Sequence, residues 1–432
     1  MKRREVVAGL AAAAVLPALP AQAKGRAVPK GFLWGTAISA HQSEGNNVNS
    51  DMWLNEHVEG TLFREPSGDA CDSYERYGED VAIAAALGFN AHRFGIEWAR
   101  IEPEPGQYSL AALDHYKRVL EACHAHGLKP MVTFSHFTTP RWFAARGGFE
   151  AAGAPELFAR FAGTVARHFG ALLDAATTFN EINAPRLIPV LAPGYDKARP
   201  RIEAMLAASA RACGSDRFAS WVFTPADRIE PPTREAHAKA YAAIKAAVPG
   251  CSVGVSLSMQ QLQPVAGGEA KATELNQILY DQWLGADTPS DFVGVQTYTR
   301  ILVGPEGSLP TPDGVEKTDA GYEFYPPALG HCVRYAAKIG RKPVIITESG
   351  IATSDDARRI AFIDATLAEV RQCLADGIDL RGYLHWSLLD NFEWTRGYSQ
   401  HFGLVAVDRK SFARTPKPSA HHLGRIARSG RL

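Results

Sequence analysis

The sequence predicts an α/β fold, a single (β/α)8 barrel with elongated loops after its strands. Short apolar runs rich in β-branched residues recur along the 432-residue chain, and amphipathic helical patterns lie between most of them. Runs that are apolar on both faces are typical of parallel strands covered by helices. Eight strand–helix alternations predict closure into a barrel, a fold that often exceeds the usual domain length as one unit. No Ser/Gly linker or charge block divides the chain.

The expected strands are short and rich in Val, Ile, Phe and Thr. In chain order they are Phe32–Thr36, Ala91–Ile96, Met131–Ser135, Thr177–Asn180, Ser252–Ser258, Phe292–Thr297, Val344–Thr347 and Gly382–Trp386. The helical patterns between them repeat apolar residues every three or four positions. The clearest are Leu113–His126, Leu157–Ala176 and Asp356–Asp376. Gly127 and Gly377 can end the first and the third of these helices.

The N-terminal residues 1–23 predict a signal peptide, which leaves residues 24–432 as the barrel domain. Lys2-Arg3-Arg4 precedes an apolar, Ala-rich stretch from Val6 to Leu19, and Ala21-Gln22-Ala23 fits a cleavage site of small residues. The apolar stretch is short for a membrane span. We expect an exported protein, periplasmic or secreted, that starts near Lys24. The twin arginines suggest export in the folded state, the general route stays open, and a retained lipid-surface anchor is the alternative.

Charge and cysteine usage exclude several classes of partner and cofactor. Lys+Arg and Asp+Glu both number 46, and this zero net charge argues against nucleic acid or an anionic membrane surface as a main partner. The six cysteines are widely spaced, so we expect buried free thiols, with one bridge left open for an exported chain. His124 and His126 are two apart on an expected helix and do not share a face. We expect no metal and no organic cofactor.

Two glutamates stand at the ends of expected strands. Glu181 directly follows the fourth strand, and Glu348 follows the seventh. A lone glutamate after a strand often starts a helix or forms a salt bridge, but a buried carboxylate is costly unless it is paired or used. In a (β/α)8 barrel the chemistry collects at the C-terminal ends of the strands. Two such carboxylates predict a glycoside hydrolase, whose retaining members place them about 5–5.5 Å apart.

Other polar and aromatic residues fall at the same expected mouth. His136, Tyr298 and Trp386 follow the third, sixth and eighth strands. Tyr298 and Arg93 are candidate donors that would keep a nucleophilic carboxylate ionised. Glu393 lies between two aromatic residues just after the last strand, a position that suits hydrogen bonds to two sugar hydroxyls. The Gly- and Pro-rich loop Arg300–Pro327 is expected to form a wall of the site.

These residues belong to motifs that resemble glycoside hydrolase family one, the β-glucosidase and β-galactosidase family, across nearly all of residues 24–432. The matching motifs are Phe32-Leu-Trp-Gly-Thr-Ala, His41-Gln42-Ser-Glu44-Gly45, Ala70-Cys71-Asp72, Arg93-Phe94-Gly-Ile-Glu-Trp98-Ala-Arg100-Ile101, Val132-Thr133-Phe134-Ser-His136, Phe179-Asn180-Glu181, Asp291-Phe292-Val-Gly294 with Tyr298, Thr318-Asp319-Ala-Gly321, Ile346-Thr347-Glu348-Ser349-Gly350, Trp386 to Trp394, and Gly397-Tyr398 with Phe402-Gly403-Leu404.

The resemblance implies a role for each matching residue. Glu181 matches the acid/base and Glu348 the nucleophile, with Arg93 and Tyr298 as neighbours of the nucleophile. The residues implied to bind the non-reducing sugar are Gln42, His136, Asn180, Tyr298, Trp386, Glu393, Trp394 and Phe402. Asn180 matches the residue that holds the 2-hydroxyl, and Trp386 matches the stacking platform. The presence of Glu393 implies an unphosphorylated sugar, because members acting on 6-phosphosugars usually lack it.

Departures from the family pattern gather on the leaving-group side. Ile182 replaces the usual proline, no tryptophan lies near Asn183-Ala184-Pro185, and Phe137 replaces a tryptophan. The remaining departures are Gln296-Thr297 for Asn-Tyr, Ser349 for Asn, and Tyr322 where tryptophan is frequent. The catalytic assignment survives these changes, but aglycone preference cannot be transferred from the family.

The sequence thus predicts a retaining, exo-acting β-glycosidase, foremost a β-glucosidase, that takes a small-molecule β-glycoside or oligosaccharide. The alternatives are a transglycosylase using the same site and a non-catalytic sugar-binding protein. The sequence does not distinguish glucose, galactose and fucose as the sugar of the substrate, and it leaves the oligomeric state open.

Overall fold

The computed structural model describes residues 27–191 and 194–432, and the predicted signal peptide, residues 1–23, lies outside the described residues. Eight parallel strands close into a barrel in the order β1-β11-β10-β7-β5-β4-β3-β2. The barrel strands are β1 (Leu33–Ala37), β2 (Ala91–Gly95), β3 (Lys129–Ser135), β4 (Ala175–Phe179), β5 (Ser252–Ser258), β7 (Phe292–Gln296), β10 (Val344–Ser349) and β11 (Leu380–Trp386). The predicted (β/α)8 barrel is confirmed, and each expected strand overlaps one of these.

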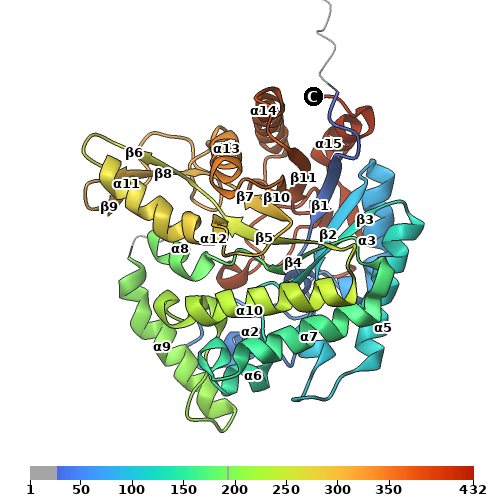
Figure 1. Ribbon diagram of the computed structural model, residues 1–432, viewed down its shortest axis with the longest axis vertical. Helices are drawn as coiled ribbons and strands as arrows, with labels where there is room; N and C mark the ends of the chain where they lie inside the picture. Colours follow the sequence, from blue (N-terminus) through green and yellow to red (C-terminus); the bar gives the residue numbers. More distant parts are fainter. Residues whose placement is uncertain (1–26, 192–193) are drawn as a thin grey trace, which may run out of the picture.

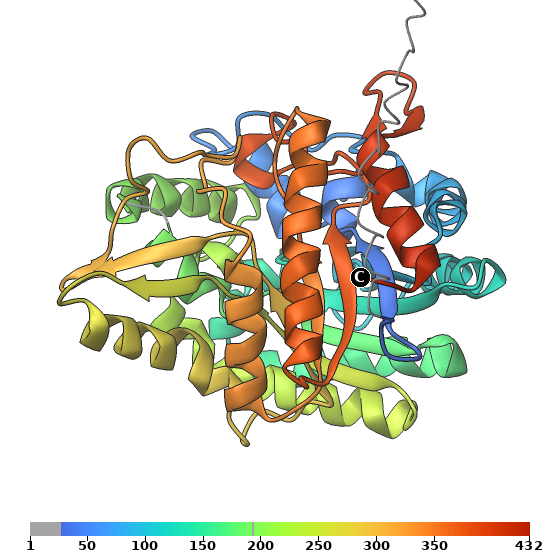
Figure 2. The same cartoon turned by 90° about the horizontal axis from the view of Figure 1, so that it is seen from above.

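Helices surround the barrel, as Figures 1 and 2 show from two directions. The helices are α1 (Ala40–Ser43), α2 (Asp51–His57), α3 (Ser73–Leu87), α4 (Trp98–Ile101), α5 (Leu110–Ala125), α6 (Arg141–Ala145), α7 (Ala154–Phe169), α8 (Ala184–Leu191), α9 (Tyr195–Ala212), α10 (Ala226–Ala247), α11 (Glu269–Asn276), α12 (Gln282–Leu284), α13 (Ala328–Gly340), α14 (Asp356–Ala375) and α15 (Pro418–Ser429). Shorter helical segments are η1 (Gly148–Glu150), η2 (Gly170–Leu172), η3 (Trp221–Phe223), η4 (Gln277–Asp281) and η5 (Trp394–Arg396).

Local signals explain where the three best-predicted helices begin and end. Ser109 caps α5 by accepting a hydrogen bond from a backbone N–H, and Asp355 caps α14 in the same way. The helix expected over Leu157–Ala176 ends at Phe169, so its predicted C-terminal end is wrong. Gly170 adopts φ 55° and ψ −134°, a conformation that ends the helix, and two alanines of the predicted helix form the start of β4.

The segment expected to be a loop, 300–327, contains strands. β8 (Arg300–Gly304) pairs with β6 (Gln261–Pro264) and with β9 (Gly307–Ser308) in a three-stranded sheet. Together with α11 this sheet forms an arm that projects from one side of the barrel in both views (Figures 1 and 2). The turn at Gly-rich residues 304–307 concealed the hairpin, because two short runs on an edge carry a weak periodic signal.

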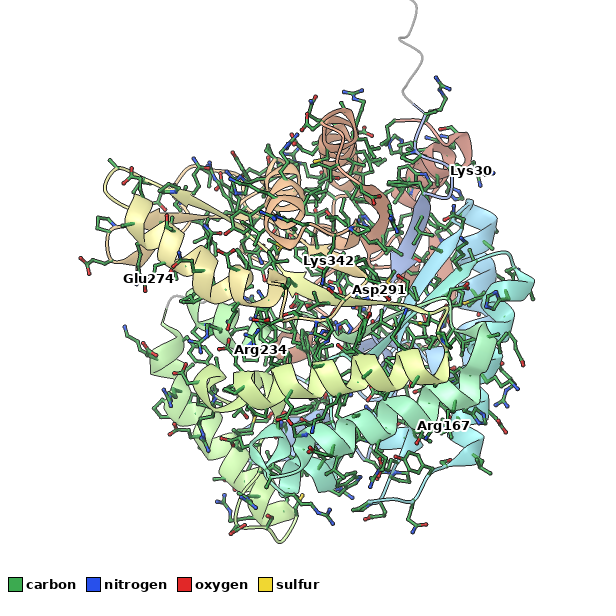
Figure 3. All side chains as sticks on the ribbon, viewed as in Figure 1. Lys30, Arg167, Arg234, Glu274, Asp291 and Lys342 are labelled. Carbon is green, nitrogen blue, oxygen red and sulfur yellow. The ribbon has the colours of Figure 1, made fainter. Side chains whose placement is uncertain are left out.

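The core is apolar and the surface carries the charges. Large buried side chains such as Trp98 and Trp283 pack between strands and helices, whereas Arg167 on α7 and Glu274 on α11 lie on the outer surface (Figure 3). All six cysteines are free thiols; five are buried, and Cys213 at the end of α9 is half-exposed, contrary to expectation. Within residues 27–191 and 194–432, no helix combines the length and apolarity needed to cross a bilayer.

The two ends of the described chain lie together. The backbone N–H of Val28 donates to the carbonyl of Gly430 over 3.0 Å, and Ala27 forms an antiparallel bridge with Arg431. A two-stranded sheet, β12 (Val405–Val407) with β13 (Arg414–Pro416), follows the last barrel strand in the sequence and precedes α15.

Candidate active site

One cavity of about 800 Å³ collects the predicted site residues at the C-terminal ends of the strands. Its lining includes Gln42, His136, Asn180, Glu181, Tyr298, Glu348, Trp386, Glu393, Trp394 and Phe402. Arg93, on β2, is fully buried directly beneath and reaches two of these side chains. The barrel geometry brings them together because each ends or follows one of the parallel barrel strands.

Glu348 lies at the end of β10 and is held by two donors. The guanidinium Nη1 of Arg93 donates to Oε1 over 2.5 Å, and the hydroxyl of Tyr298 donates to Oε2 over 2.5 Å. The carboxylate is 3% exposed, so each oxygen keeps a fixed position. A carboxylate oriented by a charged donor and a phenol is poised as a nucleophile.

Asn180 lies beside this pair, and two donors fix the orientation of its amide. Arg93 Nη2 and Gln296 Nε2 both donate to Asn180 Oδ1, over 2.5 and 2.7 Å. With its oxygen engaged, Asn180 can offer only its NH2 group to a ligand. The departure Gln296, which replaces the usual asparagine, therefore still orients the residue expected to hold the 2-hydroxyl.

Glu181 follows β4 with φ 44°, in the left-handed region that non-glycine residues rarely adopt. Burial raises the pKa of Glu181 to about 8, and the negative charge of Glu348 adds to the increase. The Ser258 hydroxyl, at the end of β5, favours the ionised carboxylate and so opposes this rise in pKa. A glutamate that stays protonated near neutral pH can serve as a general acid.

The two glutamates have different electrostatic surroundings. Burial also raises the pKa of Glu348 above its ordinary value, but the Arg93 guanidinium and the Tyr298 hydroxyl act against that increase. No comparably close cation faces Glu181 in the described part of the chain. When one proton is shared between the two carboxyls, it therefore resides on Glu181 and the charge on Glu348.

A second polar pair lies at the other side of the cavity. Gln42 Nε2 donates to the carbonyl of Phe392 over 2.8 Å and to Glu393 Oε2 over 3.1 Å. Gln42 is fully buried, and its Oε1 has no hydrogen-bond partner within the described residues. Burial, together with the charge of Glu348, raises the pKa of Glu393 to about 8. An unpaired acceptor beside a carboxyl group matches the bidentate contacts that sugar hydroxyls require.

Stacked rings form the floor between these polar groups. His136 stacks on Trp386, with ring centroids 5.6 Å apart, and on Trp394 at 6.2 Å. His41 stacks on the same Trp394 at 5.6 Å and an interplanar angle of 6°, and its Nε2 pairs with Glu56 over 2.7 Å. The ion pair and the stack lock the Trp394 ring, so the apolar face of a sugar meets a fixed surface.

Sequence reasoning missed two polar residues that act on the site: Ser258 lines the cavity, and Gln296 donates to Asn180. The sequence marks Gln296 only as a departure from the family pattern, and Ser258 only as the last residue of an expected strand. Gln260 Nε2 donates to Ser258 Oγ over 3.2 Å, which leaves the Ser258 proton free for Glu181. A polar residue ending an otherwise apolar strand was the available signal, the same one that identified His136 and Tyr298.

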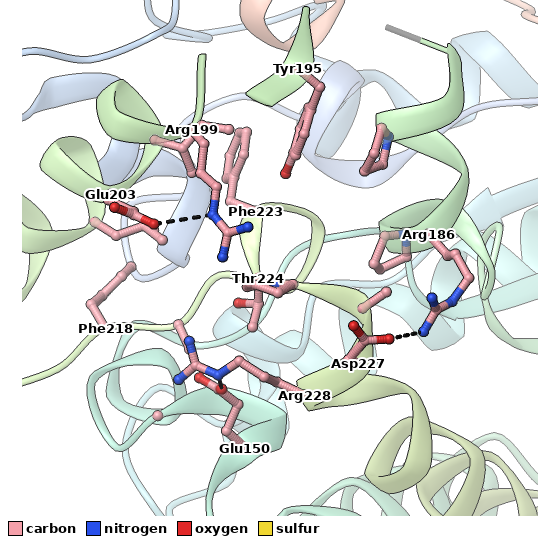
Figure 4. A pocket seen from close by; sticks show the side chains of 18 of the residues that line it. Glu150, Arg186, Tyr195, Arg199, Glu203, Phe218, Phe223, Thr224, Asp227 and Arg228 are labelled. Carbon is pink, nitrogen blue, oxygen red and sulfur yellow. Dashed lines mark hydrogen bonds and ion pairs between the residues drawn. The ribbon is translucent and has the colours of Figure 1, made fainter. Parts of the chain in front are cut away.

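A second cavity, of about 810 Å³, is lined by residues of α8, α9 and the start of α10 (Figure 4). Six of its charged groups pair with one another: Arg199 with Glu203 over 3.2 Å, Arg228 with Glu150, and Arg186 with Asp227. None of the predicted site residues lines it. Among the described residues no group of three or more His, Cys, Asp or Glu side chains could hold a metal ion.

Comparison with known proteins identifies the family of the chain. The model of glycosyl hydrolase family 1 matches residues 24–288 and 308–431. Thermostable β-glucosidase B of Thermobispora bispora is 30% identical over 91% of this chain and 89% of its own, and β-glucosidase A of Thermotoga maritima is 27% identical over 94% and 98%. The apo structure of β-glucosidase 1317 superposes with a TM-score of 0.90 at 49% identity, covering 93% of this chain and 99% of its own.

The β-glucosidase from Thermotoga maritima in complex with glucoimidazole has a TM-score of 0.82 at 25% identity, over 94% of this chain and all of its own. The family model spans most of the chain, and the barrel that carries the two strand-end glutamates is shared. The chain therefore belongs to glycosyl hydrolase family 1 and is a β-glucosidase-like glycosyl hydrolase.

Proposed function

We propose that the protein is an exo-acting, retaining β-glucosidase in which Glu348 is the nucleophile and Glu181 the acid/base. The observation that carries this assignment is the asymmetry of the two carboxyls: Glu348 accepts from Arg93 and Tyr298, whereas the pKa of Glu181 is raised to about 8. Retention needs one ionised and one protonated carboxyl at the same bond.

In the first step Glu348 attacks the anomeric carbon while Glu181 gives its proton to the leaving oxygen. Arg93 and Tyr298 hold the attacking carboxylate in one orientation, so little reorganisation is needed as the covalent bond forms. The NH2 group of Asn180 is directed by its engaged oxygen and supports the proposal that it holds the 2-hydroxyl.

In the second step the ionised Glu181 takes a proton from water, and the water oxygen attacks the anomeric carbon to release the sugar from Glu348. The Ser258 hydroxyl stabilises the ionised form of Glu181, which is the form this step requires. The two displacements return the sugar with its original configuration.

Gln42 and Glu393 support exo action on an unphosphorylated sugar. Both are fixed side chains beside Trp394, and contacts to the outermost hydroxyls would leave the bound sugar as the last residue of its chain. The negative charge of Glu348 would also repel a phosphate on that sugar. Residues 1–23 support the further proposal that the protein is exported, to the periplasm or beyond.

The test is hydrolysis of a panel of aryl β-glycosides by residues 24–432, with Glu348→Gln as the paired variant. We expect turnover by the wild type, best with the glucoside, and loss in the variant. A 2-fluoro glycoside should add its sugar mass to the peptide containing Glu348. Absence of both turnover and labelling on every sugar would contradict the assignment and favour a binding protein. Cleavage between residues 23 and 24 is checked by N-terminal sequencing of exported material.

A further inference from the structure

The half of the cavity beyond Glu181 differs in chemistry from the sugar-binding half. On the proposed function, Glu181 delivers its proton to the leaving oxygen, so the leaving group lies on the far side of Glu181 from Glu393 and Gln42. The elements on that side are α8, which begins three residues after Glu181, then η3 and the β8–β9 hairpin. The Ser308 hydroxyl donates to the carbonyl of Val190 over 3.0 Å and ties the hairpin to α8.

The side chains that these elements direct into the cavity are mostly aliphatic or aromatic. They include Ile188, Val190, Val222, Phe223, Leu302 and Leu309. Leu309 is 41% exposed at the rim, and Tyr322 opposite is 37% exposed. A contiguous apolar surface left facing solvent marks a ligand groove, because its burial by a ligand is favourable.

Several buried polar groups of this half are engaged with the protein itself, whereas Thr311, Lys317 and Tyr322 bring polar atoms to the outer part of the cavity. The guanidinium of Arg300 donates to both carboxylate oxygens of Glu323, over 2.8 and 2.7 Å, and the Thr299 hydroxyl donates to the Glu323 carbonyl over 2.9 Å. One buried exception is Gln260, which is 4% exposed and whose Oε1 has no partner within the described residues. Along the wall formed by α8, η3 and β8, a second sugar would lose hydrogen bonds to water that the aliphatic and aromatic side chains do not replace.

We infer that the leaving-group site binds a bulky apolar alcohol, with Gln260 Oε1 as an acceptor for at most one further hydroxyl, rather than a second sugar. The inference rests on the proposed function and specifies its substrate class: β-glucosides of hydrophobic alcohols. The whole cavity, including the sugar half, measures about 800 Å³, which leaves room for a bulky leaving group beside a bound sugar.

The first experiment measures kcat/KM for ethyl, butyl, hexyl and octyl β-glucosides below micelle-forming concentrations, with cellobiose beside them. These alcohols have nearly equal acidity, so the chemical step is matched and only the apolar surface changes. We expect kcat/KM to rise about two- to fourfold per added methylene until the groove is filled. Cellobiose should fall below butyl glucoside. A flat alkyl series, or cellobiose above octyl glucoside, would overturn the inference.

Two substitutions that keep the shape of the side chain test whether this apolar wall causes the dependence of kcat/KM on alkyl length. Val190→Thr and Val222→Thr each place a hydroxyl in the apolar wall with almost no change in volume. We expect kcat/KM for octyl glucoside to fall about three- to tenfold, and that for methyl glucoside to stay within twofold. Val48→Thr is the control, since Val48 is 48% exposed and lies outside the cavity. Equal losses on both substrates would contradict an apolar leaving-group site.

An activated aryl β-glucoside separates this inference from the proposed function. If the wild type hydrolyses it and Glu348→Gln does not, the glycosidase assignment holds whatever the alkyl series shows. If the wild type hydrolyses no aryl glycoside, the proposed function itself fails.

Discussion

The two halves of the cavity are built in opposite ways. The sugar half is made from strand ends and from the loop after β11, and its carboxyl groups and Asn180 are oriented by other side chains: Arg93 holds Glu348 and Asn180, and Gln42 holds Glu393. The leaving-group half is made from α8, η3 and the arm, and it presents apolar side chains whose contacts have no direction. A sugar is recognised by hydrogen bonds, whose strength depends on their angles, so its site is built on the rigid barrel. An apolar alcohol is bound through the apolar area that it buries and the fit of its shape.

The largest expected effect tests the rigid half. Glu348→Gln removes the negative charge that attacks the anomeric carbon, and we expect kcat to fall by about 10³-fold or more with every leaving group. Release of the sugar is measured with both aryl and alkyl glucosides. Thermal unfolding of the variant serves as the control, since Arg93 would remain buried opposite a neutral amide. Activity within tenfold of the wild type would remove Glu348 from the mechanism.

Glu181→Gln tests how the two halves act together, because its effect on kcat/KM should depend on the leaving group. With octyl glucoside we expect a loss of about 10²- to 10⁴-fold in kcat/KM, the usual contribution of a general acid. A dinitrophenyl glucoside leaves without a proton and should lose much less. The two rates are measured side by side on one preparation. An equal loss on both substrates would contradict the acid role.

Glu393→Gln should weaken sugar recognition alone. Replacing the Glu393 carboxyl, which accepts from Gln42, by an amide leaves buried hydrogen-bonding groups without a partner and should cost about 10- to 100-fold in kcat/KM. The comparison of the two halves predicts the same factor for methyl and octyl glucosides. A factor that changes with alkyl length would show that the halves are coupled.

The smallest expected effect concerns pH. Glu181 must be protonated for the first step, so kcat/KM should fall as pH rises above about 8, the pKa to which burial raises it. The Ser258 hydroxyl favours the ionised form; Ser258→Ala should therefore raise this pKa and move the alkaline limb to higher pH by a fraction of a unit. Ser308→Ala is the matched control, because its hydroxyl bonds to Val190 instead. A shift to lower pH would contradict the role of Ser258.

Sequence patterns predicted the barrel and the sugar half far better than the leaving-group half. Each barrel strand delivers one polar residue at a defined position, so periodicity and strand order locate Glu181, Glu348 and Tyr298 together. The β8–β9 hairpin was expected to be a loop, because its runs are short and its turn is glycine-rich. Ser258 and Gln296 end their strands as polar residues, but their roles come from Glu181 and Asn180, which follow β4, and a local pattern does not record that contact.

The bridge between Ala27 and Arg431 has a consequence for engineering. The described N-terminal segment enters β1 at the barrel end opposite the site, and α15 returns the chain to the same place. Both termini can therefore carry a tag or attach the enzyme to a solid support while the substrate entrance faces the solution. The same proximity means that a short peptide can join them, so new termini can be opened in an exposed surface turn to give a circular permutant with the barrel intact.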